Sequence, residues 1–332
     1  MIDTALILAA GLGTRLAPLS GVRAKAALPV AGDVLIRRQV RWLAAAGVRQ
    51  VIVNLHHLPA TVTSALGGGE DLGVAVRYSW EPHVLGSAGG PRQAFDLTDA
   101  PRLLIVNGDT LSDLDLGALV AEHARTQPLV TMAACDHARA GYSSLLVNAS
   151  GALAGVARAD AAPAPAAATL RAVHFMGTQV AERRAFDDAP RDTPSETVRW
   201  LYPRLLAADP GSVRVWSSGA SFFDVGTPEE YLRTTQVFAA REGRALDRGP
   251  GVEIDPTADV SGSVLWDGVR IGARAIVREC VLADGVVVPA DTRLMRAAVV
   301  RRPSGVAPAA AGGLDNLLVV PFDGAPGRIA QP

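Results

Sequence analysis

The 332-residue sequence lacks the features that mark several classes of protein. Its only cysteines, Cys135 and Cys280, are far apart, so they give neither a disulfide framework nor the paired spacing of a zinc site. No apolar run reaches the roughly 18 residues of a membrane span, and the N-terminal run stops at Gly11, too early for a signal peptide. We therefore expect a cytoplasmic protein without a membrane partner.

An excess of charge of one sign is also missing. The 32 basic and 33 acidic side chains nearly cancel, so nucleic acid is not expected as a partner and an anionic ligand needs a local site. Lysine is the rarest charged residue: Lys25 is the only lysine, and the other Lys and Arg residues are all arginine. A lysine kept against that bias suggests chemistry that needs a compact, mobile ammonium rather than the planar guanidinium of arginine. The alternative interpretation is a surface lysine without a function.

Apolar runs alternate with helical patterns over the first 130 residues. Strands are predicted at 5–9, 51–55, 74–78, 103–106 and 129–133, and helices at 34–46, 59–66, 88–96 and 115–125. This alternation predicts an α/β fold with a doubly wound, mostly parallel, Rossmann-like sheet. Ligands of such sheets bind at the carboxyl ends of the strands, here the loops after residues 9, 55, 78 and 106.

The second half of the chain is less regular. An Ala/Pro tract at 157–168 predicts a surface loop, 195–207 a helix, and 213–216 with 220–223 a strand pair. Thr227, Pro228 and Glu230 form the capping box of a further helix. After residue 250, apolar residues six apart predict a short left-handed β-helix of hexapeptide repeats. They are the pairs Ile254/Val260, Ile271/Val277 and Val281/Val287.

These patterns divide the chain into three parts. Residues 1–245 are predicted to form the catalytic domain, 250–300 the hexapeptide-repeat segment, and 301–332 a surface or partly disordered tail. The repeats are compatible with a homo-oligomer or with a vestigial segment, and the sequence leaves both open.

The first chemical motif runs from Leu8 to Arg15 and is followed by Lys25. Glycines after a strand let successive backbone N–H groups point at a phosphate chain, and an arginine fork and a lysine can neutralise its charge. The motif is neither a Walker P-loop, since no Gly-Lys-Ser/Thr follows, nor a dinucleotide fingerprint, since Leu16 stands near the third glycine. A purely structural turn is the alternative.

This stretch resembles the signature of the sugar nucleotidyltransferase (nucleotide-sugar pyrophosphorylase) family, Leu-Ala-Ala-Gly-x-Gly-Thr-Arg-Leu-x-Pro-Leu followed by Pro-Lys-x-x-x-Pro. Ala24 departs from it by replacing the proline before Lys25. Residues 81–90 resemble the family's Leu-Gly-Thr-Ala-Gly segment, and residues 54–57 resemble its mannose-1-phosphate guanylyl and muramyl-phosphate uridylyl branches. The resemblance implies nucleotide binding by Leu8, Ala10, Gly11, Gly13, Thr14, Asn54, Gly86, Ser87, Ala88 and Gly108.

Two aspartates suit a hard divalent cation. Asp109 ends the fourth strand beside Gly108, and Asp224 lies in a segment that resembles the family's Trp-x-Asp-x-Gly-Thr-Pro-Glu, with Phe222 in place of tryptophan. Together they are expected to hold Mg²⁺, while helix-dipole stabilisation is the alternative for Asp224. Asp115 is expected to be a helix N-cap, and Asp113 a solvated loop residue. His56 and His57 are not expected to form a metal site, because neighbouring residues on a strand point to opposite faces.

The sugar side shows a departure from the family. Many relatives place a lysine on the sugar phosphate in a Glu-Lys-Pro segment, whereas the corresponding tract here has none and Arg158 is the nearest cation. Tyr142 and Gly177 are expected to line the sugar pocket, and His174 is equally a core or a ligand residue.

The resemblance implies attack of a sugar 1-phosphate oxygen on the α-phosphorus of a nucleoside triphosphate, with loss of pyrophosphate. The phosphate is itself the nucleophile, so Arg15, Lys25 and Asp109 act by charge and position. GTP with mannose 1-phosphate is the leading substrate pair, and uridylyl or thymidylyl transfer to another sugar phosphate is the alternative. A catalytically silent nucleotide-sugar sensor is the rival of another class. An NAD-dependent dehydrogenase is disfavoured by the incomplete glycine fingerprint.

Overall fold

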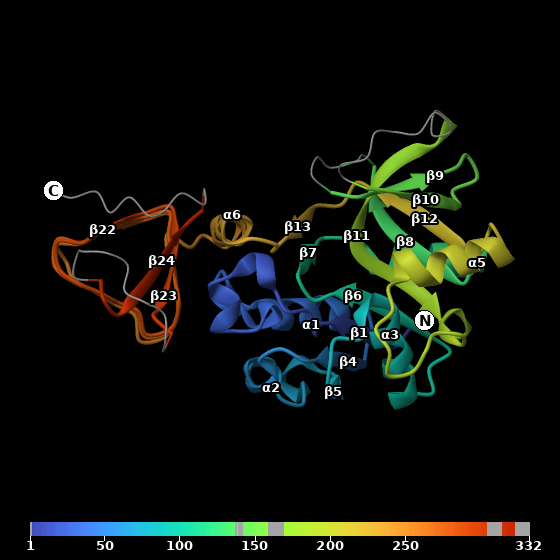
Figure 1. The fold of residues 1–332 in the computed structure, drawn as a ribbon, viewed down its shortest axis with the longest axis horizontal. Coiled ribbons are helices and arrows are strands. Elements are labelled where there is room, and N and C mark those ends of the chain that lie inside the picture. The colour runs from blue at the N-terminus through green and yellow to red at the C-terminus, as the bar shows by residue number, and fades with distance from the viewer. Residues whose placement is uncertain (1, 137, 139–141, 159–168, 304–313, 323–332) are drawn as a thin grey trace. The chain divides into compact units, whose positions relative to one another are not determined.

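The computed structural model describes residues 2–136, 138, 142–158, 169–303 and 314–322. The chain divides into two compact units, of which the first contains Met1–Gly11 and Ile36–Phe223 and the second contains Leu12–Leu35 and Asp224–Pro332. Because the second unit takes residues from both ends of the predicted catalytic domain, the boundaries near 245 and 300 stay predictions. Figure 1 shows the elements of both units.

The first unit is built on a nine-stranded sheet with the order β10-β9-β11-β6-β1-β4-β5, while β8 pairs with β11 and with β12. Its centre is parallel: β1 (Thr4–Leu8) lies between β4 (Gln50–Leu55) and β6 (Arg102–Asn107), and β5 (Ala75–Trp80) follows β4. Apolar runs bury the central strands on both faces, as a parallel sheet requires. The mostly parallel α/β sheet is confirmed, with β10 and β5 at the two ends of the strand order. Figure 1 shows β9 and β10 near the top and β5 at the bottom.

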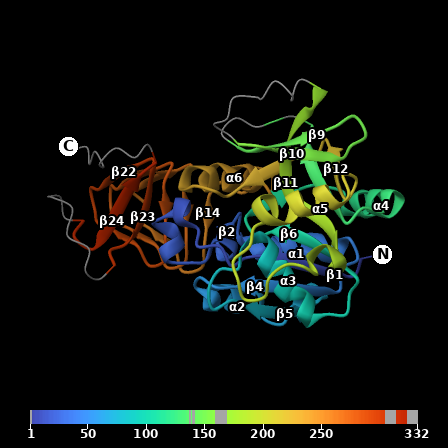
Figure 2. The same cartoon turned by 45° about the vertical axis from the view of Figure 1, so that its right-hand side comes forward.

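The predicted helices of this unit are present. They are α1 (Leu35–Ala45), α2 (Pro59–Leu66), α3 (Gly86–Ala94) and α4 (Leu116–Thr126). The side chain of Asp115 accepts a hydrogen bond from the backbone N–H of Ala118, which confirms its role as the N-cap of α4. Helix α4, visible in Figure 2, packs against β8 and β11. The helix expected at 195–207 is a π-helical turn, Thr197–Leu201, followed by α5 (Tyr202–Ala208).

The antiparallel part of the sheet differs from the prediction. Strands β9 (Ser144–Val147), β10 (Leu153–Ala157) and β11 (Arg171–Glu182) form it, and β11 also pairs antiparallel with β6 and β8 (Val130–Cys135). The expected pair at 213–216 and 220–223 is wrong: β12 (Val213–Ser218) pairs with β8, and β13 (Phe222–Asp224) with β7 (Thr110–Ser112). Most of the Ala/Pro tract, 159–168, lies outside the described residues.

Buried apolar side chains from both faces of the sheet form the core of the first unit. Phe95, directly after α3, and Phe186, in the turn after β11, pack with ring centroids 5.6 Å apart. Arg183 covers the Phe95 ring at 4.9 Å and donates hydrogen bonds to the carbonyls of Phe95 and Ala100, in the segment that follows α3. This packing fixes α3, whose first turn carries the predicted nucleotide-binding residues Gly86, Ser87 and Ala88.

The second unit begins with three short 3₁₀ turns at Thr14–Leu16, Leu19–Gly21 and Lys25–Ala27. The hairpin of β2 (Pro29–Val30) and β3 (Asp33–Val34) follows them. After residue 224 comes α6 (Pro228–Arg241), where Thr227 is confirmed as N-cap because its hydroxyl accepts from the N–H of Glu230. Helix α6 packs against β2 and against β14 (Asp247–Arg248), so the early segment and the late one form a single unit.

Three parallel sheets of short strands then form a β-helix, which confirms the hexapeptide prediction. The first sheet has β14, β17 (Val264–Leu265), β20 (Val281–Leu282) and β23 (Ala297–Arg301), and the second β15 (Glu253–Ile254), β18 (Arg270–Ile271) and β21 (Val287–Val288). The third has β16 (Asp259–Ser261), β19 (Ile276–Arg278) and β22 (Arg293–Met295). Equivalent residues of successive turns stand 17 positions apart, as do Asp267 and Asp284.

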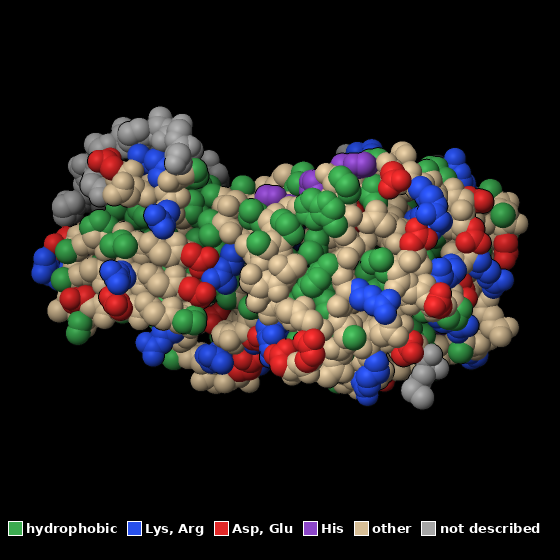
Figure 3. Space-filling model, turned by 90° about the horizontal axis from the view of Figure 1, so that it is seen from below, with side chains coloured by type: hydrophobic (Ala, Val, Ile, Leu, Met, Phe, Trp, Pro, Cys, Tyr) green, Lys and Arg blue, Asp and Glu red, His purple; other side chains and the backbone are tan. Residues whose placement is uncertain are grey.

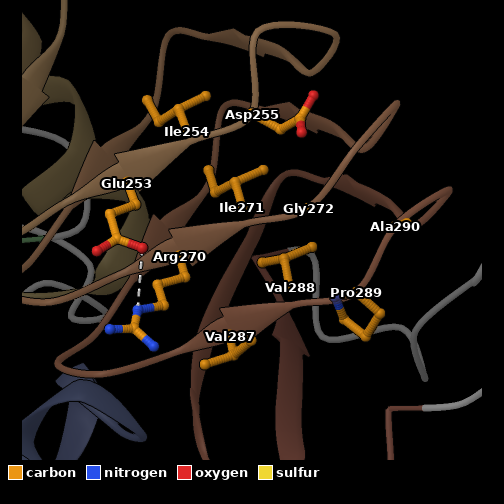
Figure 4. A pocket seen from close by; sticks show the side chains of 10 residues that line it. All are labelled: Glu253, Ile254, Asp255, Arg270, Ile271, Gly272, Val287, Val288, Pro289 and Ala290. Carbon is orange, nitrogen blue, oxygen red and sulfur yellow. Dashed lines mark ion pairs between the residues drawn. The ribbon is translucent and has the colours of Figure 1, made fainter.

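Aligned side chains make the interior of the β-helix. Figure 4 shows Ile254, Ile271 and Val288 in one column, and their register is that of paired strands. In the pair Val281/Val287, Val281 is buried, whereas Val287 is 54% exposed and its neighbour Val288 is buried instead. In the predicted tail, β24 (Leu317–Pro321) adds an antiparallel strand to β23, while 304–313 and 323–332 lie outside the described residues.

On the face that Figure 3 shows, basic and acidic side chains are interspersed and form no large patch of one charge. This agrees with the balanced charge of the sequence. Among the described residues, no helix is long and apolar enough to cross a membrane.

Candidate active site

Three parallel strands of the first unit end side by side. Leu8, the last residue of β1, is in register with Asn54 of β4 on one side and with Asn107 of β6 on the other. The loops after these strands therefore leave the same edge of the sheet, where ligands of such folds bind. This register brings Leu8 and Asn54 together, and Ala10, Gly11, Gly108 and Asp109 lie within three residues after the same strands.

The turn after β6 places Asp109 against the end of β1. Gly108 donates its N–H to the carbonyl of Leu8 at 2.9 Å, and a Cβ atom at Gly108 would lie only 2.7 Å from that oxygen. Only glycine permits this approach. The buried Gln39 holds the turn by donating from Nε2 to the carbonyls of Asn107 and Thr110, at 2.8 and 2.7 Å. Asp109 itself is half-buried, and Thr110 donates to its Oδ1 at 3.3 Å.

Asn54 has a positioning environment that the sequence reading did not foresee. Its Oδ1 accepts the N–H of Ala9 at 2.6 Å, and its Nδ2 donates to Glu81 Oε1 at 2.7 Å. Glu81 is fully buried, and its Oε2 accepts the N–H of Leu85 at 2.8 Å. The Asn54–Glu81 pair thus ties the end of β1 to the loop before α3. A buried polar pair with its hydrogen bonds made is rigid, since a broken bond would leave a desolvated group.

The first turn of α3, which contains Gly86, Ser87 and Ala88, is bound to residues 195–197. Ala88 donates its N–H to the carbonyl of Ser195 at 2.9 Å, and Ser87 Oγ donates to Glu196 Oε2 at 2.6 Å. Gly86 has φ +79°, and a Cβ there would lie 2.6 Å from the Ser195 carbonyl, so glycine is required. Glu196, an exposed carboxylate against this loop, was missed because nothing in the sequence near it signals a contact 109 residues away.

The expected sugar-binding residues lie on the antiparallel side of the sheet. Gly177 interrupts the register of β11 with φ +68°, and a Cβ there would lie 2.7 Å from Thr110 Oγ1 and 3.1 Å from Asn107 Cβ. Gly177 is thereby placed beside the Asp109 turn. The Tyr142 ring packs edge-on against His174 at 4.9 Å, and His174 against Phe222 at 5.0 Å. Arg158 is exposed directly after β10, and Gly141 lies outside the described residues.

The second unit carries the remaining charged residues of the motif. Gly13 has φ +62°, and a Cβ on it would lie 3.2 Å from Ser20 Cβ and 3.7 Å from Lys25 Cβ. The glycine is required by this backbone and places the start of the Thr14–Leu16 turn directly beside Lys25. Ala24, which replaces the family's proline, has φ −56°, within the range that a proline ring imposes. The backbone before Lys25 therefore keeps the shape that proline would give it.

Arg15 and Asp224 meet at Gly226. A Cβ atom on Gly226 would lie 3.4 Å from Arg15 Nη2 and 3.3 Å from Asp224 Oδ2, so both side chains reach the same glycine. Residues 14–25 and 224–226 are far apart in sequence but belong to one compact unit. Asp109 belongs to the other unit, and its joint action with Asp224 on a metal ion stays a prediction.

The two aspartates predicted to hold a metal ion have the oxygen donors that Mg²⁺ prefers. Within the described parts of the chain, no group of three or more His, Cys, Asp or Glu side chains could hold a metal ion alone. Mg²⁺ does not need such a cage, because one or two carboxylates suffice when substrate phosphates and waters complete its shell. The half-buried Asp109 and Asp224 are carboxylates of that kind.

Two smaller expectations need correction. His56 and His57 follow β4 rather than lie in it, so strand alternation does not separate them; His56 Nδ1 instead lies 2.9 Å from the carbonyl oxygen of Glu81. Asp113 is exposed but not merely solvated, because its Oδ1 accepts the N–H of Ser221 at 2.6 Å.

Comparison with known proteins assigns the family. Residues 4–240 match the model of the nucleotidyl transferase family, and residues 248–297 match that of the GlmU-like C-terminal hexapeptide. The chain belongs to the nucleotidyl transferase family. Within this family it is a sugar-1-phosphate nucleotidyltransferase, as its curated relatives are.

The relatives differ in their named substrates. The mannose-1-phosphate guanylyltransferase of Mycobacterium tuberculosis is 27% identical over 304 residues, 82% of each chain. The N-acetylmuramate alpha-1-phosphate uridylyltransferase of Neisseria meningitidis is 42% identical over 115 residues, 34% of this chain and 50% of that one. The crystal structure of HddC from Yersinia pseudotuberculosis has a TM-score of 0.61 at 21% identity, covering 71% of this chain and 100% of that chain, and supports the nucleotidyl transferase fold.

Proposed function

We propose that this nucleotidyltransferase joins GTP to mannose 1-phosphate, giving GDP-mannose and pyrophosphate. The similarity to the mycobacterial mannose-1-phosphate guanylyltransferase supports this pair, because it extends over 82% of both chains and includes both parts of the molecule. A cytoplasmic location belongs to the same proposal and rests on the sequence features given above.

The observation that carries the proposed chemistry is the gathering of charged motif residues in the second unit. Lys25 lies beside Gly13, and Arg15 reaches Gly226 together with Asp224. Two cations next to a glycine turn suit a triphosphate, whose leaving pyrophosphate gains negative charge during the reaction. In the proposed mechanism a non-bridging oxygen of the sugar phosphate bonds to the α-phosphorus, and the bond from that phosphorus to the bridging oxygen of pyrophosphate breaks.

The chain's own residues bind and orient in this mechanism. The proposed roles are neutralisation of the leaving group by Arg15 and Lys25, support of the nucleotide by the loop of Gly11 and the first turn of α3 at Gly86, and binding of Mg²⁺ by Asp109 and Asp224. Mg²⁺, when bound, supplies positive charge to the phosphate oxygens. No protein nucleophile is needed, because the phosphate monoester is already an anion. For the sugar we propose Tyr142, Gly177 and Arg158, the last in place of the missing lysine.

A second candidate is uridylyl transfer to a sugar phosphate of the N-acetylmuramate or glucose type. The 42% identity to the Neisseria uridylyltransferase favours it, although that match covers 115 residues. The match to the UTP–glucose-1-phosphate uridylyltransferase of Synechocystis, 25% identical over 280 residues, supports the glucose type. A silent sensor is disfavoured, because the chain retains Arg15, Lys25 and both aspartates.

The test is pyrophosphate release with Mg²⁺, using GTP, UTP, dTTP, ATP and CTP against mannose, glucose and N-acetylmuramate 1-phosphates. Release mainly with GTP and mannose 1-phosphate is expected. Release mainly with UTP would replace this substrate pair by the second candidate. Silence of the whole panel, with nucleotide still bound in an equilibrium binding assay, would favour the sensor.

A further inference from the structure

The β-helix contacts the segment that carries the proposed triphosphate-binding residues. Strand β23 packs against the Leu19–Gly21 turn, within the second unit. Two residues before Lys25, the side chain of Arg23 extends to the β-helix and is only 15% exposed. No motif signals this residue, because its partners are 244 and 261 positions away in sequence.

Arg23 is held by two successive turns of the β-helix. Its Nε and Nη2 donate to the two carboxylate oxygens of Asp284, at 2.8 and 2.6 Å, and Nη2 also donates to Asp267 Oδ2 at 2.7 Å. A bidentate arginine–carboxylate pair fixes direction as well as distance, which a lysine could not do. Burial works against the charge of Arg23, but its hydrogen bonds to and attraction by Asp284 and Asp267 raise its pKa.

The two aspartates form a column of like charge. They occupy equivalent positions 17 residues apart, on turns that stack through paired strands, and Asp284 Oδ1 also accepts the N–H of Asp267 at 3.2 Å. Stacked carboxylates repel one another unless a cation lies between them. Arg23 supplies that cation from outside the β-helix, so the repeat is matched to the segment that docks on it.

Apolar and aromatic contacts extend the same anchor. The Arg23 guanidinium lies 5.3 Å from the ring centroid of the fully buried Trp266. Trp266 donates from Nε1 to the hydroxyl of Tyr231 at 2.9 Å, and Tyr231 in turn donates to the carbonyl of Pro29. Residues before and after Lys25 are thereby attached to the β-helix and to α6.

We propose that Arg23 is a positioning residue: its clamp on Asp267 and Asp284 lets the β-helix hold Lys25 and the glycine turn in the conformation used for triphosphate binding. This inference rests on the proposed function of Lys25. It gives the hexapeptide repeats a role in the reaction of their own chain. Displacement of a positioning group by about 1 Å can cost on the order of 100-fold in rate.

The test compares Arg23→Gln with Arg274→Gln in the full chain. Arg274 makes a similar bidentate pair with Asp291, at 2.7 and 2.6 Å, but its side chain is 64% exposed and both residues belong to the β-helix. We expect Arg23→Gln to raise hydrogen–deuterium exchange in peptides covering residues 13–28, without substrate present. We expect it to lower kcat/KM for the nucleotide by at least about tenfold, whereas Arg274→Gln changes neither.

Conservative variants keep the inference testable if Arg23→Gln folds poorly. Arg23→Lys retains the charge without the fork, and Asp284→Asn removes a charge partner and leaves Arg23 in place; both should give smaller changes of the same kind. Faster exchange confined to the β-helix strands, with unchanged exchange at 13–28 and unchanged kcat/KM, would overturn the proposal in favour of a purely structural ion pair. If the wild type releases no pyrophosphate, the proposed function fails, and the exchange at 13–28 still decides whether Arg23 holds the segment.

Discussion

The two units hold their proposed site residues by different means. In the first, the strand-end loops are fixed by buried hydrogen bonds, such as those of Asn54 and the fully buried Glu81. In the second, the cationic segment is fixed by a partly buried ion pair, Arg23 with Asp284. Buried hydrogen bonds are insensitive to salt, whereas ion pairs near the surface are screened by it. The comparison teaches that buried hydrogen bonds fix the proposed nucleotide-binding loops, whereas an ion pair to the β-helix fixes the proposed triphosphate-binding segment.

The largest expected effect comes from the charged segment itself. Lys25→Ala should leave the fold intact and lower kcat by about two to three orders of magnitude, because a charge-stabilising group of this kind supplies that much. Lys25→Arg should recover only part of the loss, since the fork does not reproduce a compact ammonium. Steady-state pyrophosphate release, with circular dichroism for the fold, measures both.

The matched control for Lys25 is Arg125→Ala, a change at an exposed cation on α4 with a side chain 68% exposed. Its turnover should equal that of the wild type. Wild-type turnover in Lys25→Ala as well would remove the proposed role and leave Lys25 a surviving surface lysine.

A smaller effect is expected from the buried pair of the first unit. Glu81→Gln places an amide donor where Glu81 now accepts from both Asn54 Nδ2 and Leu85 N–H. A desolvated group left without its partner costs about 1–3 kcal/mol, so the free energy of unfolding should fall by that amount and the KM for the nucleotide should rise. Urea unfolding and nucleotide titrations measure the two quantities.

Asp71→Asn is the control for Glu81→Gln. Asp71 pairs with Arg37 but is 60% exposed, and exposed pairs contribute little to stability. Equal losses of stability in the two variants would contradict the contrast between buried and exposed polar groups, and an unchanged nucleotide KM in Glu81→Gln would separate Glu81 from the site.

The smallest effect concerns His123, a buried histidine outside the proposed site. Its ring nitrogens lie 2.8 Å from Thr131 Oγ1 and 3.0 Å from Glu182 Oε1. Burial lowers its pKa, although the hydrogen bond and attraction of Glu182 work in the other direction. Because protonation is harder in the folded state, its contribution to stability is complete above about pH 6.5 and is lost as the pH falls toward the folded-state pKa.

Thermal unfolding between pH 8 and pH 5 tests this sign. The wild type should lose more stability on acidification than His123→Gln does, while nucleotide binding at pH 8 stays the same in both proteins. Parallel pH profiles would show that His123 does not contribute to the acid sensitivity.

Local patterns predicted much of the fold, and their limits are physical. The helix starts at Asp115 and Thr227 were predictable because capping depends on neighbours in sequence. The repeat spacing identified the β-helix but did not fix which apolar residue of each strand is buried: Val287, a member of a predicted pair, is exposed, and Val288 is buried. Strands β9 and β10 were not predicted, and the pairing of β9 with β11 connects residues on opposite sides of the long Ala/Pro tract, which no local pattern reveals.

The same division applies to the site. Glycines such as Gly13, which needs a positive φ, and charges such as Lys25 mark themselves in a motif. Their supports do not: Glu81 bonds to Asn54 over 27 positions and Arg23 to Asp284 over 261, and neither spacing follows from local periodicity. The sequence therefore predicted candidate binding residues but not the residues that position them.

The most direct test of the account is exchange of labelled pyrophosphate into the nucleoside triphosphate without any sugar phosphate. Direct attack by the sugar phosphate predicts no exchange with enzyme, Mg²⁺ and nucleotide alone, and rapid exchange once the nucleoside diphosphate sugar is added. Exchange without the sugar would reveal a covalent nucleotidyl-enzyme, and would contradict the claim that charge and position suffice.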